Sequence, residues 1–221
     1  MIIVMLGAPA TGKGTVASIL SERLNIPQIS TGDIFRKNIS DKTELGKIAE
    51  EYISKGNLVP DEITINMVKN RLNESDAQKG AILDGFPRTI PQADALEKIL
   101  ADKKMKIDMV LNLSTPREEI IERVITRRVC SNQECKAIFN TKLNPPKIEG
   151  ICDKCGNKLI TRKDDTLEAI ETRLENYFKL TNPLVDYYKE KGVLKTEEVS
   201  EKIHKMGKDV AEEIAEKFKN A

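Results

Sequence analysis

The sequence predicts an α/β fold, in which helices wind over both faces of a parallel β-sheet. Short apolar runs alternate with segments of helical periodicity along most of the chain, which is the pattern of a doubly wound core. A glycine-rich loop joins the first apolar run to the first helical segment. Residues 31–60 and 129–161 break the alternation, and we expect both to be insertions on the core.

The strands of the core are predicted from short apolar runs. Residues 2–6 are continuously apolar and β-branched, as in a strand that is buried on both faces. Residues 14–24 follow with apolar side chains at helical spacing, which indicates a helix. We expect the remaining strands at residues 28–30, 81–84, 109–113 and 193–195, with helical segments between them.

Three helix boundaries can be predicted from local signals. Thr115-Pro116-Arg117-Glu118 predicts a start, with Thr115 as the N-cap and Glu118 completing a capping box, and a helix that runs to residue 128. Ile90-Pro91 opens another helix, which continues to about residue 100. A long helix over 165–188 should be interrupted or kinked at Pro183, because proline lacks the N–H that a helix interior uses.

The two insertions differ in composition. Residues 31–60 have apolar side chains at helical spacing and Gly56 as a stop, which favours short helices without a strand. Residues 129–161 lose the helical period and are rich in Asn, Pro, Gly and Cys.

Composition excludes several classes of function. Thirty-six Lys and Arg against 35 Asp and Glu leave a net charge of +1, and 4% aromatic residues offer few stacking platforms, so we do not expect a nucleic-acid binder. The single histidine, His204, lies in a charged stretch and is predicted to be a solvated helix residue. The absence of a basic leader and of a long apolar window predicts a cytoplasmic protein without membrane contact.

Residues 7–15, Gly-Ala-Pro-Ala-Thr-Gly-Lys-Gly-Thr, form a phosphate-binding loop between a buried strand and a helix. Glycines allow backbone N–H groups to surround an anion, and the helix N-terminus adds partial positive charge. Lys13 would bring a full charge to the β and γ phosphates of a nucleoside triphosphate. Gly14 separates Lys13 from Thr15, whereas the general pattern places Ser or Thr directly after the lysine.

Further motifs follow this loop in order: Gln28-Ile-Ser-Thr-Gly-Asp33, Leu83-Asp-Gly-Phe-Pro-Arg-Thr89, Pro145-Pro-Lys-Ile-Glu-Gly150 and Thr161-Arg-Lys-Asp-Asp165. Together with the loop, they closely resemble the adenylate kinases over essentially the whole chain. The resemblance implies a P-loop nucleoside monophosphate kinase fold, with a five-stranded parallel sheet flanked by helices. It also implies a core domain of residues 1–29, 60–126 and 163–221, a helical NMP-binding domain of 30–59, and a zinc-bearing lid of 127–162.

The implied reaction is reversible transfer of the terminal phosphoryl group from Mg·ATP to AMP, giving two ADP and maintaining the adenine nucleotide pool. Such transfer requires positioning and charge neutralisation and needs no general base, because the acceptor is already an anion. Arginine binds two phosphate oxygens at once. By resemblance, Arg36 and Arg88 hold the acceptor phosphate, while Arg123, Arg127, Arg162 and Arg173 surround the transferring group. Arg123 and Arg127 are four residues apart, so we expect them on one helix face.

The resemblance assigns the other contacts as well. The donor ATP would meet Ala10, Thr11, Gly12, Lys13, Gly14, Thr15, Arg123, Arg127, Ile138 and Phe139, with Lys195 the nearest candidate for the donor adenine. AMP would meet Thr31, Arg36, Asn57, Leu58, Val59, Gly85, Phe86, Pro87, Arg88, Gln92, Arg162 and Arg173, and the Gln92 amide can both donate to and accept from an adenine edge.

We assign Asp33 and Asp84 to the water shell of Mg²⁺. Asp164 and Asp165 would help to close the lid, or could form a helix N-cap pair.

The four cysteines all lie in the second insertion, with the spacing Cys130-x4-Cys135-x16-Cys152-x2-Cys155. Two pairs of this kind can present four thiolates in a tetrahedron, which suits a structural Zn²⁺ and would also accept iron. Disulfides are disfavoured in the cytoplasm, and so polar a segment is unsuited to free core thiols. Long-type adenylate kinases are similar, since some carry zinc in the lid, although Cys-x2-Cys is their usual first spacing.

Two alternatives to an ATP:AMP enzyme remain at this stage. One is a GTP:AMP phosphotransferase, because the residues around the donor base are less distinctive than those of the acceptor. The other is a non-catalytic, zinc-bearing nucleotide-binding module. A monomer that uses ATP, AMP and ADP is the expectation that follows from the resemblance.

Overall fold

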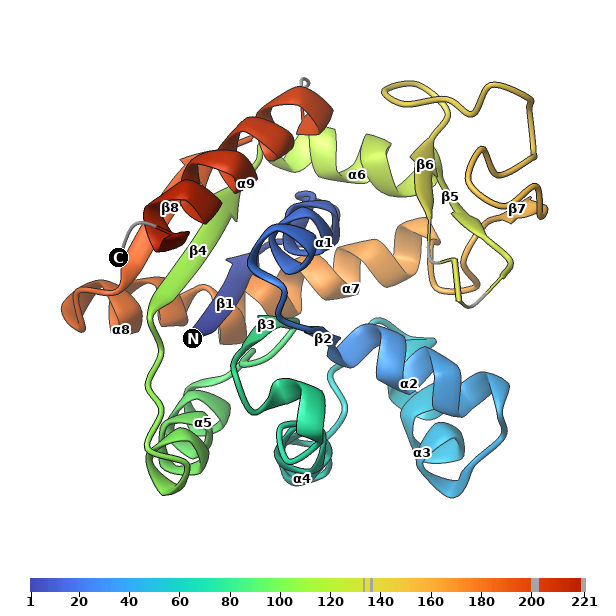
Figure 1. The fold of residues 1–221 in the computed structure, drawn as a ribbon. Coiled ribbons are helices and arrows are strands. Elements are labelled where there is room, and N and C mark those ends of the chain that lie inside the picture. The colour runs from blue at the N-terminus through green and yellow to red at the C-terminus, as the bar shows by residue number, and fades with distance from the viewer. Residues whose placement is uncertain (133, 136, 200–202, 220–221) are drawn as a thin grey trace.

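A computed structural model describes residues 1–132, 134–135, 137–199 and 203–219 of the chain. In these ranges, five parallel strands form the central sheet in the order β2-β3-β1-β4-β8. The strands are β1 (Ile2–Gly7), β2 (Gln28–Ser30), β3 (Ala81–Asp84), β4 (Met109–Ser114) and β8 (Leu194–Glu198). The sheet therefore confirms the predicted fold class, with β1 and its glycine-rich loop at the centre (Figure 1).

Alternate residues of β1 contribute to two separate hydrophobic cores, which explains its continuous apolar run. Ile2, Val4 and Leu6 face helices α4 (Asp61–Arg71), α5 (Ile90–Asp102) and α8 (Pro183–Glu190). Ile3 and Met5 face α1 (Lys13–Leu24) and α9 (Ile203–Lys219) on the other side. Both faces of the strand are thus removed from water, as in a doubly wound sheet.

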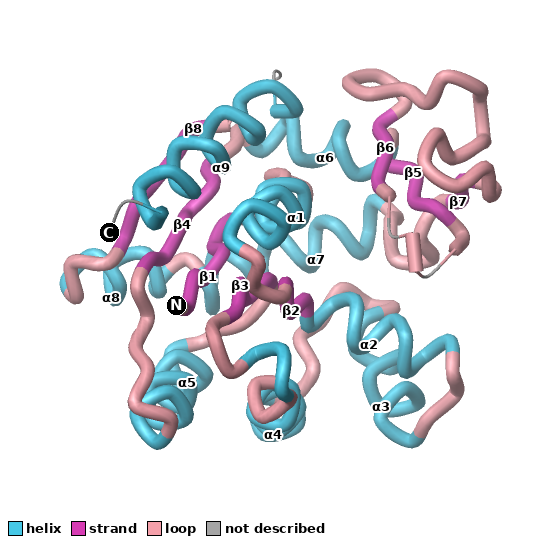
Figure 2. Tube along the Cα trace, viewed as in Figure 1, coloured by secondary structure: helices cyan, strands magenta, loops and turns pink. Residues whose placement is uncertain are grey.

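The remaining helices position the two insertions. Helices α2 (Thr31–Ser40) and α3 (Glu44–Ile53) form the first insertion, as predicted, and pack together where Gly46 allows the close approach of the Asn38 backbone. Helices α6 (Arg117–Ile125) and α7 (Leu167–Asn176) lead to and from the second insertion. In Figures 1 and 2 both insertions lie on the right of the molecule, on the side away from the two termini.

The second insertion contains a small antiparallel sheet that the sequence analysis did not predict. Strand β5 (Arg127–Cys130) lies between β6 (Ile138–Asn140) and β7 (Leu159–Ile160). Its own core consists of Cys130, Ala137, Phe139 and Cys152. So small a core has little apolar surface with which to hold the insertion together.

Several predicted boundaries are wrong. Helix α6 ends at Ile125, so Arg127 begins β5 and does not share a helix face with Arg123. The predicted capping box is absent, since Pro116 is the N-cap and the Thr115 hydroxyl instead donates to the Val199 carbonyl at 2.8 Å. The last strand begins and ends later than expected, at Leu194–Glu198.

The predicted long helix is interrupted near Pro183, as expected. Helix α7 ends at Asn176 and is followed by a π-helical turn, Tyr177–Thr181, before α8 begins at Pro183. The widened turn is consistent with the N–H that proline lacks. Among the described residues, no helix has the length and apolar character needed to span a membrane.

Candidate active site

A cavity of about 560 Å³ lies at the carboxyl ends of β1, β2 and β3 and extends to both insertions. Ligands of open α/β sheets bind at this edge. Its walls include the glycine-rich loop, the start of α2, the 84–92 segment, β6 and the last turn of α7. The cavity therefore brings together segments that are far apart in the sequence.

The glycine-rich loop has the geometry of an anion cradle. Gly12 is the N-cap of α1 and has a left-handed φ of 91°, and Gly7 has a φ of 135°, in the region that favours glycine. The Lys13 Nζ folds over the loop and donates to the carbonyls of Gly7 at 2.8 Å and Ala8 at 2.6 Å. Burial lowers the pKa of Lys13 to about 8, with Arg88 and Arg127 acting in the same direction and Asp84 opposing them.

Six arginines line this cavity: Arg36, Arg88, Arg123, Arg127, Arg162 and Arg173. Burial is the main cause that lowers the pKa of Arg162 and of Arg173 to about 9, and like charges add to it. Burial also lowers the pKa of Arg88, with Arg36 contributing. In the part of the chain that the structure describes, the Arg162 guanidinium makes no hydrogen bond or ion pair, although the Arg162 carbonyl accepts from the Asp165 N–H at 3.1 Å. The site thus holds buried like charges that an anion would stabilise.

Asp164 and Asp165 position two of these arginines. The Asp165 carboxylate accepts two hydrogen bonds from the Arg127 guanidinium, and it also lies 3.7 Å from Arg173. Asp164 pairs with Arg173. The two aspartates are not the helix N-cap pair that was considered as an alternative, because Thr166 caps α7 by accepting from the N–H of Ala169.

Arg123 is held by the end of the central sheet. Its Nη2 donates to the Glu119 carboxylate at 2.7 Å and to the Val199 carbonyl at 3.3 Å. Its Nη1 lies 3.3 Å from the Thr115 hydroxyl, which itself bonds to Val199. Thr115 therefore contributes to the site by orienting an arginine, although the sequence analysis gave it a capping role.

Asp33 and Asp84 both line the cavity, from the first turn of α2 and the end of β3. Asp33 pairs with Arg36 at 2.5 Å. An Asp84 oxygen lies only 3.6 Å from the position that a Cβ on Gly14 would occupy, so this carboxylate faces the start of α1. Carboxylate oxygens and water are the ligands that Mg²⁺ prefers, and the position beside the phosphate cradle fits that ion.

Most of the predicted acceptor residues also line the cavity: Thr31, Asn57, Leu58, Val59, Gly85, Pro87 and Gln92. Gly85 has a φ of 82°, and its carbonyl accepts from the Thr31 hydroxyl at 3.0 Å and from the Arg88 Nε at 3.0 Å. Phe86 is fully buried in the core and supports this segment from behind.

The predicted donor residues divide into two groups. Ala10, Gly12, Gly14, Thr15, Ile138 and Phe139 line the cavity. Thr11 is a fully buried residue of the loop, and its hydroxyl donates to the Ala8 carbonyl at 3.0 Å. Lys195 does not line the cavity, and its Nζ pairs with Glu213 at 2.8 Å and Glu197 at 3.1 Å.

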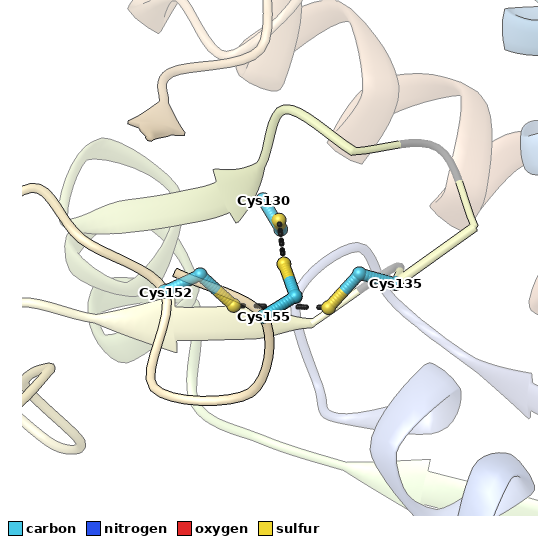
Figure 3. A group of neighbouring side chains, drawn as sticks. All are labelled: Cys130, Cys135, Cys152 and Cys155. Carbon is cyan, nitrogen blue, oxygen red and sulfur yellow. Dashed lines mark hydrogen bonds between the residues drawn. The ribbon is translucent and has the colours of Figure 1, made fainter. Parts of the chain in front are cut away.

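The four cysteines converge in the second insertion (Figure 3). Their sulfur atoms all lie within 4.8 Å of one another, and the pairs Cys130–Cys155 and Cys135–Cys152 are 3.4 and 3.7 Å apart. All four are free thiols, so the disulfide alternative is not supported. Burial raises the pKa of Cys130 to about 12, whereas hydrogen bonds from Asn157 lower that of Cys155 to about 6. Four sulfur donors in this arrangement could hold a metal ion.

Some residues of the site could not be predicted from the sequence, because their contribution depends on tertiary contacts. Tyr177 and Thr181 of the π-helical turn line the cavity, and so do Asn140 and Leu143 of the second insertion. Asp61 lies behind the acceptor segment and accepts hydrogen bonds from Thr89 and Gln92. None of these belongs to a recognisable motif, and only the π-helical turn has a local signal, Pro183.

The comparisons with known proteins agree with this geometry. The family model for adenylate kinase matches residues 5–193. The adenylate kinase of Caldicellulosiruptor saccharolyticus is 54% identical over 210 residues, which is 95% of this chain and 97% of the relative. Adenylate kinases of Clostridium kluyveri and Streptomyces coelicolor are 53% and 52% identical, covering 93% and 89% of this chain and 94% and 90% of theirs.

The ion pairs of Asp165 give a prediction about stability. Asp165→Asn should lower the free energy of unfolding by about 3–5 kcal/mol, because it leaves the Arg127 charge buried without its partner. Urea denaturation monitored by circular dichroism measures this change. Glu122→Gln, which breaks the exposed pair with Lys142, is the control and should cost under about 1 kcal/mol. Equal effects of the two substitutions would contradict the prediction.

Proposed function

The chain belongs to the adenylate kinase family, and from this premise we propose which of its residues carry out the family's reaction. It is a nucleoside monophosphate kinase that transfers the terminal phosphoryl group of ATP to AMP, giving two ADP. ATP, AMP and ADP are its substrates and products, and Mg²⁺ accompanies ATP in this family.

The observation that carries the proposal is the convergence of Lys13 and six arginines on a single cavity. Phosphoryl transfer between two nucleotides brings several negative charges together, and catalysis consists mainly of positioning them and neutralising their charge. The attacking oxygen belongs to an ionised phosphate, so no side chain has to remove a proton. His204, the single histidine, belongs to α9, and its side chain lies outside the described residues.

We assign the donor phosphates to the glycine-rich loop. The N–H groups at the start of α1 and Lys13 would hold the β and γ phosphates, and Arg123 and Arg127 would contact the transferring group. Ile138 and Phe139 of β6 would flank the donor base at the other end of the cavity. The Lys195 Nζ forms ion pairs with two glutamates, so its contacts do not support its assignment to the donor base.

We assign AMP to the side of the cavity formed by the first insertion and the 85–92 segment. Arg36 and Arg88 would bind its phosphate, with Arg162 and Arg173 between the two nucleotides. Thr31, residues 57–59, residues 85–87 and Gln92 would contact the nucleoside. The Arg162 guanidinium makes no hydrogen bond or ion pair among the described residues, which supports its assignment to a phosphate.

Asp84 and Asp33 would hold the magnesium ion through water molecules, as proposed from the sequence. The position of Asp84 beside the start of α1 supports its part in this assignment. Mg²⁺, when bound with ATP, neutralises charge on the β and γ phosphates. Asp33 also orients Arg36, so it acts on the acceptor side as well.

The cysteine cluster is proposed to hold a structural zinc ion. Four thiolates complete a tetrahedron and leave no open coordination position. The ion would supply the stability that the small core of the second insertion lacks. We propose residues 127–162 as this lid, residues 30–59 as the NMP-binding domain, and 1–29, 60–126 and 163–221 as the core. A closed lid would exclude water, which could otherwise accept the phosphoryl group.

A matrix of phosphotransfer assays tests the proposed activity. ATP, GTP and UTP are each combined with AMP, CMP and UMP, and nucleotide diphosphates are quantified by chromatography. ATP with AMP should be the best pair, and Lys13→Ala should abolish its turnover. Absence of ADP from ATP and AMP would refute the assignment, whereas GTP as the better donor would establish the GTP:AMP alternative.

The lowered pKa of Lys13 predicts proton uptake on binding. At pH 8 about half of the Lys13 amines are neutral, because burial lowers their pKa to about 8. A bound triphosphate favours the charged form and raises this pKa, so ATP binding should take up as much as half a proton, roughly, at pH 8. At pH 6.5 the amine is already charged and the uptake should be near zero.

Calorimetric titration of ATP in buffers of different ionisation enthalpy measures this uptake. Lys13→Met is the matched control, since it retains Arg162 and Arg173, whose pKa values are also lowered. The prediction fails if the wild-type protein and Lys13→Met take up the same number of protons at pH 8.

Removal of one cysteine thiolate should lower the stability of the protein more than its reaction rate. Cys155→Ser should lower the zinc content and the melting temperature, while the rate at low temperature changes little, because Cys155 is not among the residues that line the cavity. Metal analysis, thermal denaturation and rate measurements test this, with Ser131→Ala as the control. Full zinc content with an unchanged melting temperature would argue against a structural zinc site.

A further inference from the structure

Asp61 binds the residue that we assign to the acceptor base. It is the first residue of α4, and its Oδ1 accepts from the Gln92 Nε2 at 2.7 Å while its Oδ2 accepts from the Thr89 hydroxyl at 2.9 Å. The Gln92 Oε1 accepts from the backbone N–H of Arg88 at 2.8 Å. Gln92 is only 2% exposed, yet it lines the cavity.

These contacts determine which end of the Gln92 amide is nitrogen and which is oxygen. A carboxylate only accepts hydrogen bonds, and a backbone N–H only donates. Rotating the amide by 180° would place the amide oxygen against Asp61 and the NH₂ group against the Arg88 N–H. Both hydrogen bonds would then become repulsive contacts in a buried position.

The partners on either side cannot easily rearrange to accept the rotated amide. The carbonyl of Arg88 accepts from the Thr181 hydroxyl at 2.9 Å, which fixes the backbone on one side of Gln92. Thr89 is the N-cap of α5 and accepts from the backbone N–H of Gln92 at 3.2 Å. The π-helical turn and the helix cap therefore both restrain the segment that faces Asp61.

An amide in one orientation distinguishes the purines. One N–H of Nε2 and one lone pair of Oε1 remain beyond the two bonds described. Adenine presents an acceptor at N1 and a donor at N6, whereas hypoxanthine and guanine present a donor at N1 and an acceptor at O6. A freely rotating amide could satisfy either pattern, but a fixed amide matches only one for a base held in one position.

We propose that Asp61 is a positioning residue that sets the base specificity of the acceptor site. It excludes 6-oxopurine monophosphates by holding the Gln92 amide in the orientation that matches adenine. This inference rests on the proposed placement of AMP against Gln92. It assigns specificity to a residue that lies behind the one in contact with the base.

The test compares AMP with inosine monophosphate, which carries the 6-oxo pattern without the 2-amino group of guanine. Asp61→Asn keeps the shape of the side chain but can donate as well as accept, so it removes one of the two contacts that oppose the rotated amide and leaves only the contact with the Arg88 N–H. The ratio of kcat/KM for AMP to that for inosine monophosphate should fall at least about tenfold, roughly the worth of one hydrogen bond. The KM for ATP should not change, and Glu62→Gln, an exposed neighbour in the same helix turn, should leave the ratio at its wild-type value.

Each outcome has a distinct meaning. If Asp61→Asn lowers kcat/KM equally for both acceptors, Asp61 has only a structural role and the inference is overturned, while the ATP:AMP activity of the wild type stands. A wild-type protein that forms no ADP would instead refute the proposed function.

A second measurement does not depend on the folding of Asp61→Asn. The Gln92 side-chain amide of the free wild-type protein, assigned by its absence in Gln92→Glu, should exchange with water more slowly than exposed glutamine amides in NMR spectra. Exchange as fast as that of exposed glutamines would also overturn the inference.

Discussion

The burial of like charges around one cavity is the constraint on which the rest of the site depends. Lys13, Arg162 and Arg173 all have pKa values lowered mainly by burial, so the protein holds these cations at a cost before any ligand arrives. Fixed charges of this kind need no rearrangement when negative charge develops, which is the advantage of preorganisation. The same arrangement explains why a chain with a net charge of +1 can be strongly selective for polyanions.

The architecture holds these charges with neighbouring acceptors. Asp165 binds the first residue of β5, Arg127, from the segment that returns from the second insertion. Glu119 and the Val199 carbonyl hold Arg123 at the end of the central sheet. Backbone carbonyls of the glycine-rich loop hold Lys13. Arg127, Arg123 and Lys13 are thus each oriented by a group that can be replaced by, or shared with, a phosphate oxygen.

The sequence was sufficient for features that depend on local pattern, and insufficient for those that depend on distant contacts. Strands 28–30 and 81–84 were predicted at their observed bounds, because buried runs and glycine boundaries are local signals. Thr115 has the local signature of a cap, but it bonds to Val199, 84 residues away, which no short window can reveal. The end of α6 before Arg127 is set by the pairing of β5 with β6 and β7. Asp61 has no motif, and its role is visible only when α4 lies beside Gln92.

The ion pairs at the base of the second insertion couple ligand binding to the contacts that join the two ends of this insertion. Arg127 and Cys130 lie on the same four-residue strand, so a metal bound by the cysteine cluster would support, through β5, one of the arginines that we assign to the phosphates. Asp164 and Asp165 form ion pairs with the same guanidinium groups that a phosphate would bind. A nucleotide must therefore compete with, or share, the contacts that join the two ends of the insertion. Where a phosphate displaces one of these aspartates, the coupling is reciprocal: the ion pair weakens phosphate binding by the same free energy by which the bound phosphate weakens the ion pair.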